Sequence, residues 1–216
     1  MDPTFWEQRW ETNQIGFHEG KPNRFLVKHL ARLAPGRVLV PLAGKTVDLD
    51  LLVESGREVT AVELVERAVH DYFRERGSIP EPERSASGER YRRGALSFVR
   101  GDVLEHEADP YDVVFDRAAT IALPPRLRER YAAHVATLVR PDGQVLLVTI
   151  EHDATSEGAP AGPPFSVERA EVERLYATAF VIQELESEDV FAESKSLSAR
   201  GATRVLERVY ELRRKR

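Results

Sequence analysis

The stretch VLVPLAGKTVDLDLL, residues 38–52, decides the fold, because an apolar strand, a turn with one glycine and a helical segment follow one another there. It contains Gly44-Lys45-Thr46, which resembles the end of an ATPase phosphate loop. A phosphate loop also needs a glycine five positions before the Gly-Lys pair, so that successive backbone N–H groups wrap the phosphates. Leu39 stands there instead. The spacing therefore disfavours an ATPase and favours a turn that holds another nucleotide.

Strand and helix patterns alternate along most of the chain. The apolar runs predict strands at 37–41, 58–64, 96–102, 111–118 and 144–152, with two last strands within 180–191 and 202–214. Helical spacing and caps predict helices at 4–13, 22–34, 46–55, 65–76, 125–139 and 167–178, the last of them opened by Ser166. The polar segment 78–93 reads as a mobile surface insertion.

This alternation predicts an α/β fold with a mostly parallel, Rossmann-like sheet and helices on both faces. No helical pattern separates the last two strands, which predicts an antiparallel hairpin at the sheet edge. The 216 residues suit a single domain, 1–216, and no apolar segment demands a partner, so a monomer is expected.

Composition narrows the functional classes. A net charge of −5 makes nucleic acid a poor partner, and no apolar run is long enough to span a membrane. The absence of cysteine excludes disulfides, thiolate zinc sites and a cysteine nucleophile, and the six histidines lack metal-ligand spacing. The first residues carry acids and tryptophans rather than a signal peptide, so a cytoplasmic location is expected.

Three residues mark a nucleotide site at the carboxyl ends of the predicted strands. Gly44 follows the first strand, Glu63 ends the second 19 residues later, and Asp102 ends the third. An acid about 20 residues after the glycine turn is the usual partner of ribose hydroxyls. The three-glycine dinucleotide fingerprint is absent, so a nucleoside without phosphate, such as S-adenosylmethionine, fits better than a nicotinamide cofactor. A plain strand-to-helix turn and a surface acid remain the structural alternatives for Gly44 and Glu63.

Several longer motifs carry a resemblance to a known family. From Phe5 to about Leu212, the chain resembles the thiopurine S-methyltransferase family, through the following stretches: FWEQRWETNQIGFHEG, VLVPLAGKTVDLDLL, VTAVELVERAV, YDVVFDRAATIALPPRLRERYA and GPPFSVERAEVERL. The resemblance implies a seven-stranded methyltransferase sheet, with residues 1–35 as a helical lid over a core of 36–216. It also implies S-adenosylmethionine as cofactor and S-adenosylhomocysteine as product.

The resemblance further implies roles for single residues. The cofactor would be bound by Trp10, Leu42, Gly44, Glu63, Asp102, Val103 and Arg117. Arg117 would be the catalytic residue and would bind the acceptor together with Phe17. Lys195 and Arg200 are both candidates for a further cation near the acceptor. The family commonly has cysteine where Ala43 stands, a difference that a backbone contact tolerates.

The chemistry expected from these residues is methyl transfer to a small thiol, selenol or tellurol, in the manner of thiopurine S-methylation and with a detoxifying role. A thiol has an ordinary pKa near 8.5, so a cation such as Arg117 is more useful than a strong base. The alternatives are a salt bridge between Arg117 and Asp116, a halide or thiocyanate methyltransferase, a non-catalytic sensor that binds S-adenosylmethionine, and a nicotinamide dehydrogenase.

Overall fold

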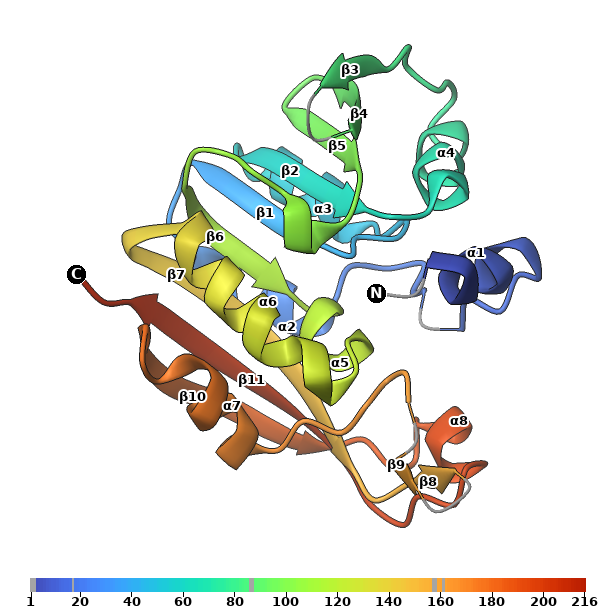
Figure 1. Ribbon diagram of the computed structural model, residues 1–216, viewed down its shortest axis with the longest axis vertical. Helices are drawn as coiled ribbons and strands as arrows, with labels where there is room; N and C mark the ends of the chain where they lie inside the picture. Colours follow the sequence, from blue (N-terminus) through green and yellow to red (C-terminus); the bar gives the residue numbers. More distant parts are fainter. Residues whose placement is uncertain (1–2, 17, 86–87, 157–158, 161) are drawn as a thin grey trace. The chain divides into compact units, whose positions relative to one another are not determined.

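The computed structural model describes residues 3–16, 18–85, 88–156, 159–160 and 162–216. The chain divides into two compact units, Met1–Val114 and Phe115–Arg216, which are described one at a time (Figure 1).

The first unit is built around parallel strands. Its helices are α1 (Pro3–Glu11), α2 (Arg24–His29), α3 (Asp48–Glu54) and α4 (Glu66–Arg74), with 3₁₀ turns η1 (Leu30–Arg32) and η2 (Val103–Glu105). Its strands are β1 (Arg37–Pro41), β2 (Glu58–Glu63), β3 (Glu83–Ser85), β4 (Gly88–Arg93), β5 (Leu96–Arg100) and β6 (Tyr111–Asp116). The last two residues of β6 belong to the second unit. The strand order is β6-β1-β2-β5-β4-β3.

The central strands of this unit are parallel. β1 pairs with β2 and β6, and β2 pairs with β5, with Val38 opposite Val59 and Val113. Successive residues Val38 and Leu39 are both inaccessible to solvent. A strand whose two faces are covered reads as a continuous apolar run, which is why the strand at 37–41 could be predicted to the residue.

The segment 78–93 corrects the sequence prediction. It was expected to be a mobile insertion, but β3 and β4 lie in it, and both are antiparallel: β3 with β4 and β4 with β5. Tyr91 is the buried anchor of β4, at 2% exposure. The other residues of β4 are a glycine and four charged residues, so the sequence has no apolar alternation that would predict a strand there.

The start of α2 is fixed by side chains from two places in the chain. The Asn23 side chain caps α2 by accepting from the backbone N–H groups of Phe25 and Leu26. The backbone N–H of Asn23 in turn donates to Asp48 Oδ1 over 2.6 Å. Because Asp48 is only 1% exposed and also accepts from the Thr46 hydroxyl, α2 is tied to the turn after β1.

The second unit contains the rest of the sheet strands. Its helices are α5 (Ala119–Ala122), α6 (Pro125–Leu138), α7 (Arg169–Tyr176) and α8 (Lys195–Ser198). Its strands are β7 (Val139–His152), β8 (Thr155–Ser156), β9 (Ala159–Pro160), β10 (Phe180–Asp189) and β11 (Val205–Arg214). β11 lies between β7 and β10 and is antiparallel to both, with a bulge in β10 between Glu184 and Glu186.

Three details of the second unit and of the strand count differ from expectation. The described residues form nine sheet strands besides the β8–β9 pair, not seven, and the two additional strands are β3 and β4. The connection between β10 and β11 contains the short helix α8 and is longer than a hairpin turn. Ser166 does not cap α7; its hydroxyl accepts from the backbone N–H of His152 over 2.9 Å.

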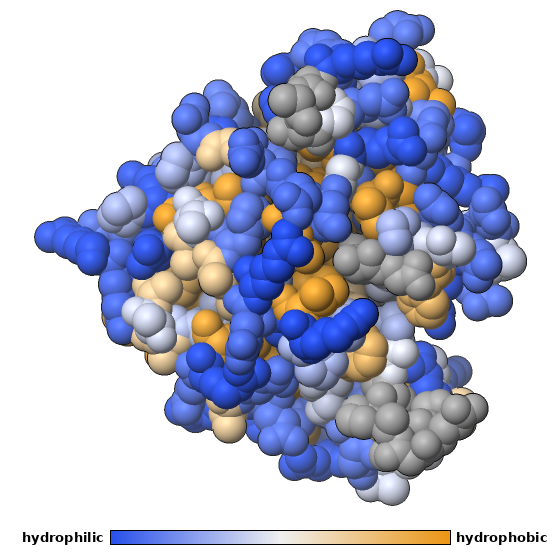
Figure 2. Space-filling view, viewed as in Figure 1, coloured by the Kyte–Doolittle hydropathy of each residue, from blue (hydrophilic) through white to orange (hydrophobic). Residues whose placement is uncertain are grey.

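In the face drawn in Figure 2, hydrophilic side chains surround smaller groups of apolar ones. Among the described residues, the large apolar side chains that are exposed lie on separate segments: Phe5, Val27, Ile79, Val181 and Phe191. In the part of the chain that the structure describes, no helix has the length and apolar character needed to cross a bilayer.

We predict that Gly36→Ala lowers the free energy of unfolding by about 2–4 kcal/mol, which chemical denaturation can measure. A Cβ at Gly36 would lie 2.2 Å from Asp112 Oδ2, and its φ of +106° is unfavourable for alanine. Asp112 would have to move, although it accepts from the Arg37 N–H over 2.6 Å. Gly77→Ala is the matched control, because Gly77 has φ +103° and no atom within 4 Å of such a Cβ. Equal losses in the two variants would contradict the proposed clash.

Candidate functional site

The turn after β1 has an unusual backbone. Leu42 has a φ of +48° and Gly44 a φ of +55°, so two of three successive residues adopt the left-handed conformation. The intervening Ala43 donates its N–H to Val62 O over 3.1 Å, which ties the turn to the end of β2. A non-glycine residue at φ +48° is energetically costly and marks a turn whose shape is imposed by its surroundings.

Glu63, the last residue of β2, is held by this turn. Its Oε2 accepts from the Gly44 N–H over 2.8 Å, and its Oε1 accepts from the Val65 N–H over 2.9 Å. The side chain is only 7% exposed. Burial raises the pKa of the Glu63 carboxyl, and the backbone N–H groups of Val65, Gly44 and Leu64 oppose that rise.

Trp10 lies against the same turn. Its indole atom Cζ2 is 3.3 Å from the position that a Cβ on Gly44 would take, so the ring covers the glycine. Trp10 is 3% exposed and packs with Val65 and Ala68 of the α4 region, with Trp6 and Ile15 beside them. The structure therefore brings together Trp10, Gly44 and Glu63, which were assigned to one site from the sequence.

Asp102 and Val103 lie one strand further along. The Gly101 N–H donates to Glu63 O over 2.9 Å, so the ends of β2 and β5 are joined directly. Asp102 caps η2, since its Oδ1 accepts from the Leu104 N–H over 2.9 Å. Val103 is 2% exposed. The backbone between Arg100 and Leu104 is therefore fixed beside the glutamate.

The Lys45-Thr46 pair has structural partners. Lys45 Nζ forms an ion pair with Glu75 Oε1 at 2.6 Å, beyond the end of α4. The Thr46 hydroxyl donates to Asp48 Oδ2 over 2.8 Å, in the cluster that anchors α2. Both side chains thus serve contacts within the first unit, in agreement with the spacing that disfavours a phosphate loop.

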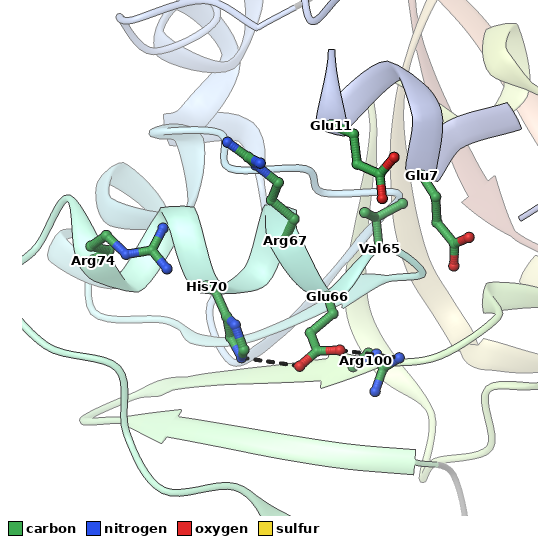
Figure 3. Close-up of a pocket in the computed structure, with 8 residues that line it drawn as sticks. All are labelled: Glu7, Glu11, Val65, Glu66, Arg67, His70, Arg74 and Arg100. Atoms are coloured by element: carbon green, nitrogen blue, oxygen red, sulfur yellow. Dashed lines mark ion pairs between the residues drawn. The ribbon is translucent and has the colours of Figure 1, made fainter. Parts of the chain in front are cut away.

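A cavity of about 450 Å³ lies between α1 and α4. Figure 3 shows Glu7 and Glu11 on one side of it and the α4 side chains on the other. Its lining residues are Glu7, Glu11, Val65, Glu66, Arg67, His70, Arg74 and Arg100. Glu66 pairs with His70 at 3.7 Å and with Arg100 at 3.4 Å. None of the residues assigned from the sequence lines this cavity, but Val65, which donates its N–H to Glu63, does, so the cavity adjoins the Glu63 cluster.

Arg117 belongs to the second unit and directly follows β6. The structure places it half-buried in the turn between β6 and α5. The neighbouring Asp116 carboxylate accepts from Ala119, Thr120 and Tyr131. Phe17 lies outside the described residues.

The Gly162-Pro163-Pro164 turn collects further polar side chains of the second unit. Arg200 Nη1 donates to Pro163 O over 3.1 Å, and His152 Nε2 lies 3.1 Å from Pro164 O. Phe165 N donates to Ile121 O over 2.7 Å, which joins this turn to α5. Arg200 is half-buried at the turn, whereas Lys195 is exposed on α8.

Sequence reasoning missed how these turns are supported, and it considered Asp116 only as an ion-pair partner of Arg117. Asp48, Asp116 and Arg128 are all 1% exposed, and each joins segments that are separate in the chain. Arg128 donates to Leu123 O, to Ser166 O and to Glu171 Oε2. The sequence gives one local indication of these roles. Asp48 is the first residue of α3 and Asp116 lies three residues before α5, and aspartate is a common cap at a helix start.

In the described residues, no group of three or more histidine, aspartate or glutamate side chains could hold a metal ion.

Comparison with known proteins decides the family. The family model of thiopurine S-methyltransferase matches residues 1–215. This chain belongs to the thiopurine S-methyltransferase family. As a member, it is an S-adenosylmethionine-dependent methyltransferase acting on a small-molecule acceptor.

Relatives in this family cover the whole chain. The thiopurine S-methyltransferase of Pseudomonas fluorescens (strain Pf0-1) is 42% identical over 219 residues, with 99% of each chain covered. That of Azotobacter vinelandii (strain DJ / ATCC BAA-1303) is 42% identical over 221 residues, with both chains covered completely.

Solved structures support the methyltransferase fold. The 1,6-didemethyltoxoflavin-N1-methyltransferase of Burkholderia thailandensis, solved with S-adenosylhomocysteine, has a TM-score of 0.67 and 20% identity. The match covers 99% of this chain and 87% of that one. An arsenic(III) S-adenosylmethionine methyltransferase of Chlamydomonas reinhardtii has a TM-score of 0.60 and 18% identity, over 83% and 64% of the two chains.

We predict that Lys45→Ala lowers the free energy of unfolding by about 1 kcal/mol or less and leaves S-adenosylmethionine affinity unchanged, because the ion pair with Glu75 is a surface contact. Glu75→Ala removes the other partner and should have the same effect. Denaturation and titration calorimetry measure both quantities. A loss of affinity above tenfold in Lys45→Ala alone would mean that the lysine contacts the nucleotide.

Proposed function

We propose that this methyltransferase transfers a methyl group to the sulfur, selenium or tellurium of a small acceptor, in the manner of thiopurine S-methylation. The observation that carries the proposal is the Trp10–Gly44–Glu63 cluster in a member of the thiopurine S-methyltransferase family. The same proposal includes a monomeric protein in the cytoplasm with a detoxifying role, in which residues 1–35 act as a lid on a single methyltransferase domain.

The first unit fits the cofactor at Glu63. The Gly44 and Val65 N–H groups each bond one carboxylate oxygen, and the Leu64 N–H acts on the same group. A carboxylate offers about four lone-pair positions, so positions remain on it for a ligand. Two such positions on neighbouring oxygens match the two adjacent hydroxyls of a ribose. Gly44 has no side chain, which leaves room for the Trp10 ring to lie directly against the turn.

The other assigned residues complete the cofactor proposal. Trp10 would lie against the methionine end, with Leu42 and Gly44 contributing backbone contacts. Asp102 and Val103 would flank the adenine. Arg117 would lie near the sulfonium. S-adenosylmethionine supplies a methyl group on a sulfonium, whose departure as a neutral thioether needs no acid.

The chain's contribution on the acceptor side is charge and orientation. We assign Arg117 to the reacting sulfur or selenium, and we keep Phe17 as the other proposed acceptor-binding residue. A guanidinium favours the ionised acceptor and lowers the pKa of its thiol, which releases its proton to solvent before the sulfur takes the methyl group. Arg200 is the better second cation than Lys195, because it is half-buried at the Pro163 carbonyl while Lys195 is exposed.

We predict that Glu63→Gln weakens S-adenosylmethionine binding at least tenfold, since a charged hydrogen-bond acceptor is lost.

The affinity of the unaltered protein should also depend on pH. Because burial raises the pKa of Glu63, the affinity for S-adenosylmethionine should fall at a higher pH than it would with an ordinary glutamate. Binding depends on the ionised form, so affinity is present above that pKa and falls as the pH drops through it. Calorimetric titration across acidic pH measures this. Glu58→Gln, an exposed acid at the start of the same strand, is the control; the same pH profile in Glu63→Gln would refute the role.

The decisive experiment is methyl transfer from labelled S-adenosylmethionine to 6-mercaptopurine, with a selenol and iodide as parallel acceptors. We expect thiol and selenol turnover that Arg117→Met lowers by about 100-fold, the cost of losing one charge-stabilising group. Arg200→Met should raise KM for the acceptor, whereas Lys195→Met should leave it unchanged. Turnover of iodide alone would favour a halide methyltransferase. Cofactor binding without turnover on any acceptor would refute the proposed acceptor class.

A further inference from the structure

Asp116 is the most completely bonded carboxylate near Arg117. Its Oδ1 accepts from the backbone N–H groups of Ala119, at 2.9 Å, and Thr120, at 3.2 Å. Its Oδ2 accepts from the Thr120 hydroxyl, at 2.6 Å, and from the Tyr131 hydroxyl, at 2.8 Å. The side chain is 1% exposed. Four neutral donors therefore define the position of this carboxylate.

The hydrogen bond from Ala119 to Asp116 closes a small ring of backbone. Only Arg117 and Ala118 lie between the two bonded residues in the chain. Ala118 precedes α5 and offers no side chain that could cap it, so Asp116 satisfies the first free N–H groups of that helix. The backbone that carries Arg117 is thereby fixed at both ends of the turn.

Two tyrosines connect the pair of Asp116 and Thr120 to other helices of the second unit. Tyr131 comes from α6 and bonds Asp116 directly. Tyr176, at the end of α7, lies 3.0 Å from the Thr120 hydroxyl. Burial and the Asp116 carboxylate raise the pKa of Tyr131 well above its usual value. Its hydroxyl therefore keeps its proton and donates throughout the working pH range.

We propose that Asp116 is a positioning residue for methyl transfer: its four hydrogen bonds lock the turn that presents Arg117 to the acceptor. The inference rests on the role given to Arg117 under the proposed function. An arginine side chain has many rotamers, so a fixed backbone is the condition for placing its guanidinium reproducibly. Loosening the turn reduces the fraction of molecules with the cation in place and lowers kcat rather than cofactor affinity.

The test is Asp116→Asn combined with Arg117→Met in a double-mutant cycle. Asparagine keeps the acceptor for Ala119 and Thr120, and the hydroxyls of Thr120 and Tyr131 can turn to accept from its amide. We expect kcat for 6-mercaptopurine to fall about tenfold in Asp116→Asn, with the S-adenosylmethionine dissociation constant unchanged. In the Arg117→Met background, the same substitution should cause no further loss. An equal loss in both backgrounds, or a folded Asp116→Asn variant with full kcat, would overturn the proposal.

A second measurement does not depend on the acceptor. Hydrogen exchange of the amides at 117–120 should accelerate about tenfold in Asp116→Asn, because a neutral amide oxygen accepts more weakly than a carboxylate and local opening becomes easier. Glu151→Gln is the matched control: it removes another buried strand-end carboxylate of the second unit, bonded to Arg204 and Arg208, and should leave the exchange at 117–120 unchanged.

The exchange result also separates the two proposals. If the unaltered protein methylates no acceptor, the proposed function fails by itself. Faster exchange confined to 117–120 would then still support the Asp116 anchor, and unchanged exchange would overturn it.

Discussion

The first unit depends on one buried carboxylate, that of Glu63, which accepts hydrogen bonds from backbone N–H groups. The Gly44 N–H donates to one oxygen of Glu63 and the Val65 N–H donates to the other. The hydrogen bond from Gly44 requires the left-handed turn at Leu42 and Gly44. That turn itself requires the parallel pairing of β1 with β2. The hydrogen bonding of Glu63 also places Val65 under Trp10, so the N-terminal helix is packed by the same arrangement. Burying a carboxylate is costly unless donors surround it, and here the backbone supplies them.

Both units have a buried carboxylate at the end of a strand, but the hydrogen bonds to that carboxylate differ. In each, an acid at the end of a strand accepts from backbone N–H groups. Glu63 accepts from Gly44, in the turn after β1, and from Val65, whereas Asp116 accepts from the start of the helix that follows it. Glu63 has lone pairs left for a ligand, whereas the four donors around Asp116 leave it engaged with its own chain. A carboxylate in the first situation is suited to recognition, and one in the second is suited to support. Strand-end position alone does not distinguish these roles; the number of donors from the chain does.

The sequence was informative where burial and pattern coincide. The parallel strands are continuous apolar runs, so β1 and β2 and the glycine turn between strand and helix could be predicted nearly to the residue. β3 and β4 could not, because a strand with polar side chains on both faces has no period to detect. Ser166 looked like a helix cap, but a serine hydroxyl takes the partner that the fold brings to it, and that partner is His152. The Lys45–Glu75 pair and the Arg200 contact with Pro163 join residues about 30 or more positions apart, which no local rule anticipates.

The edge strand β10 has a consequence for how the protein behaves at high concentration. It is paired with β11 on one side, its middle is bulged at Glu184 and Glu186, and Glu188 and Asp189 follow. An open strand edge is a template for adding a strand from another molecule, and charge and irregular backbone are the features that prevent it. At neutral pH, two such edges repel each other before their backbones can pair. The acidic side chains of β10 therefore disfavour edge-to-edge association, besides contributing to the negative charge of the chain.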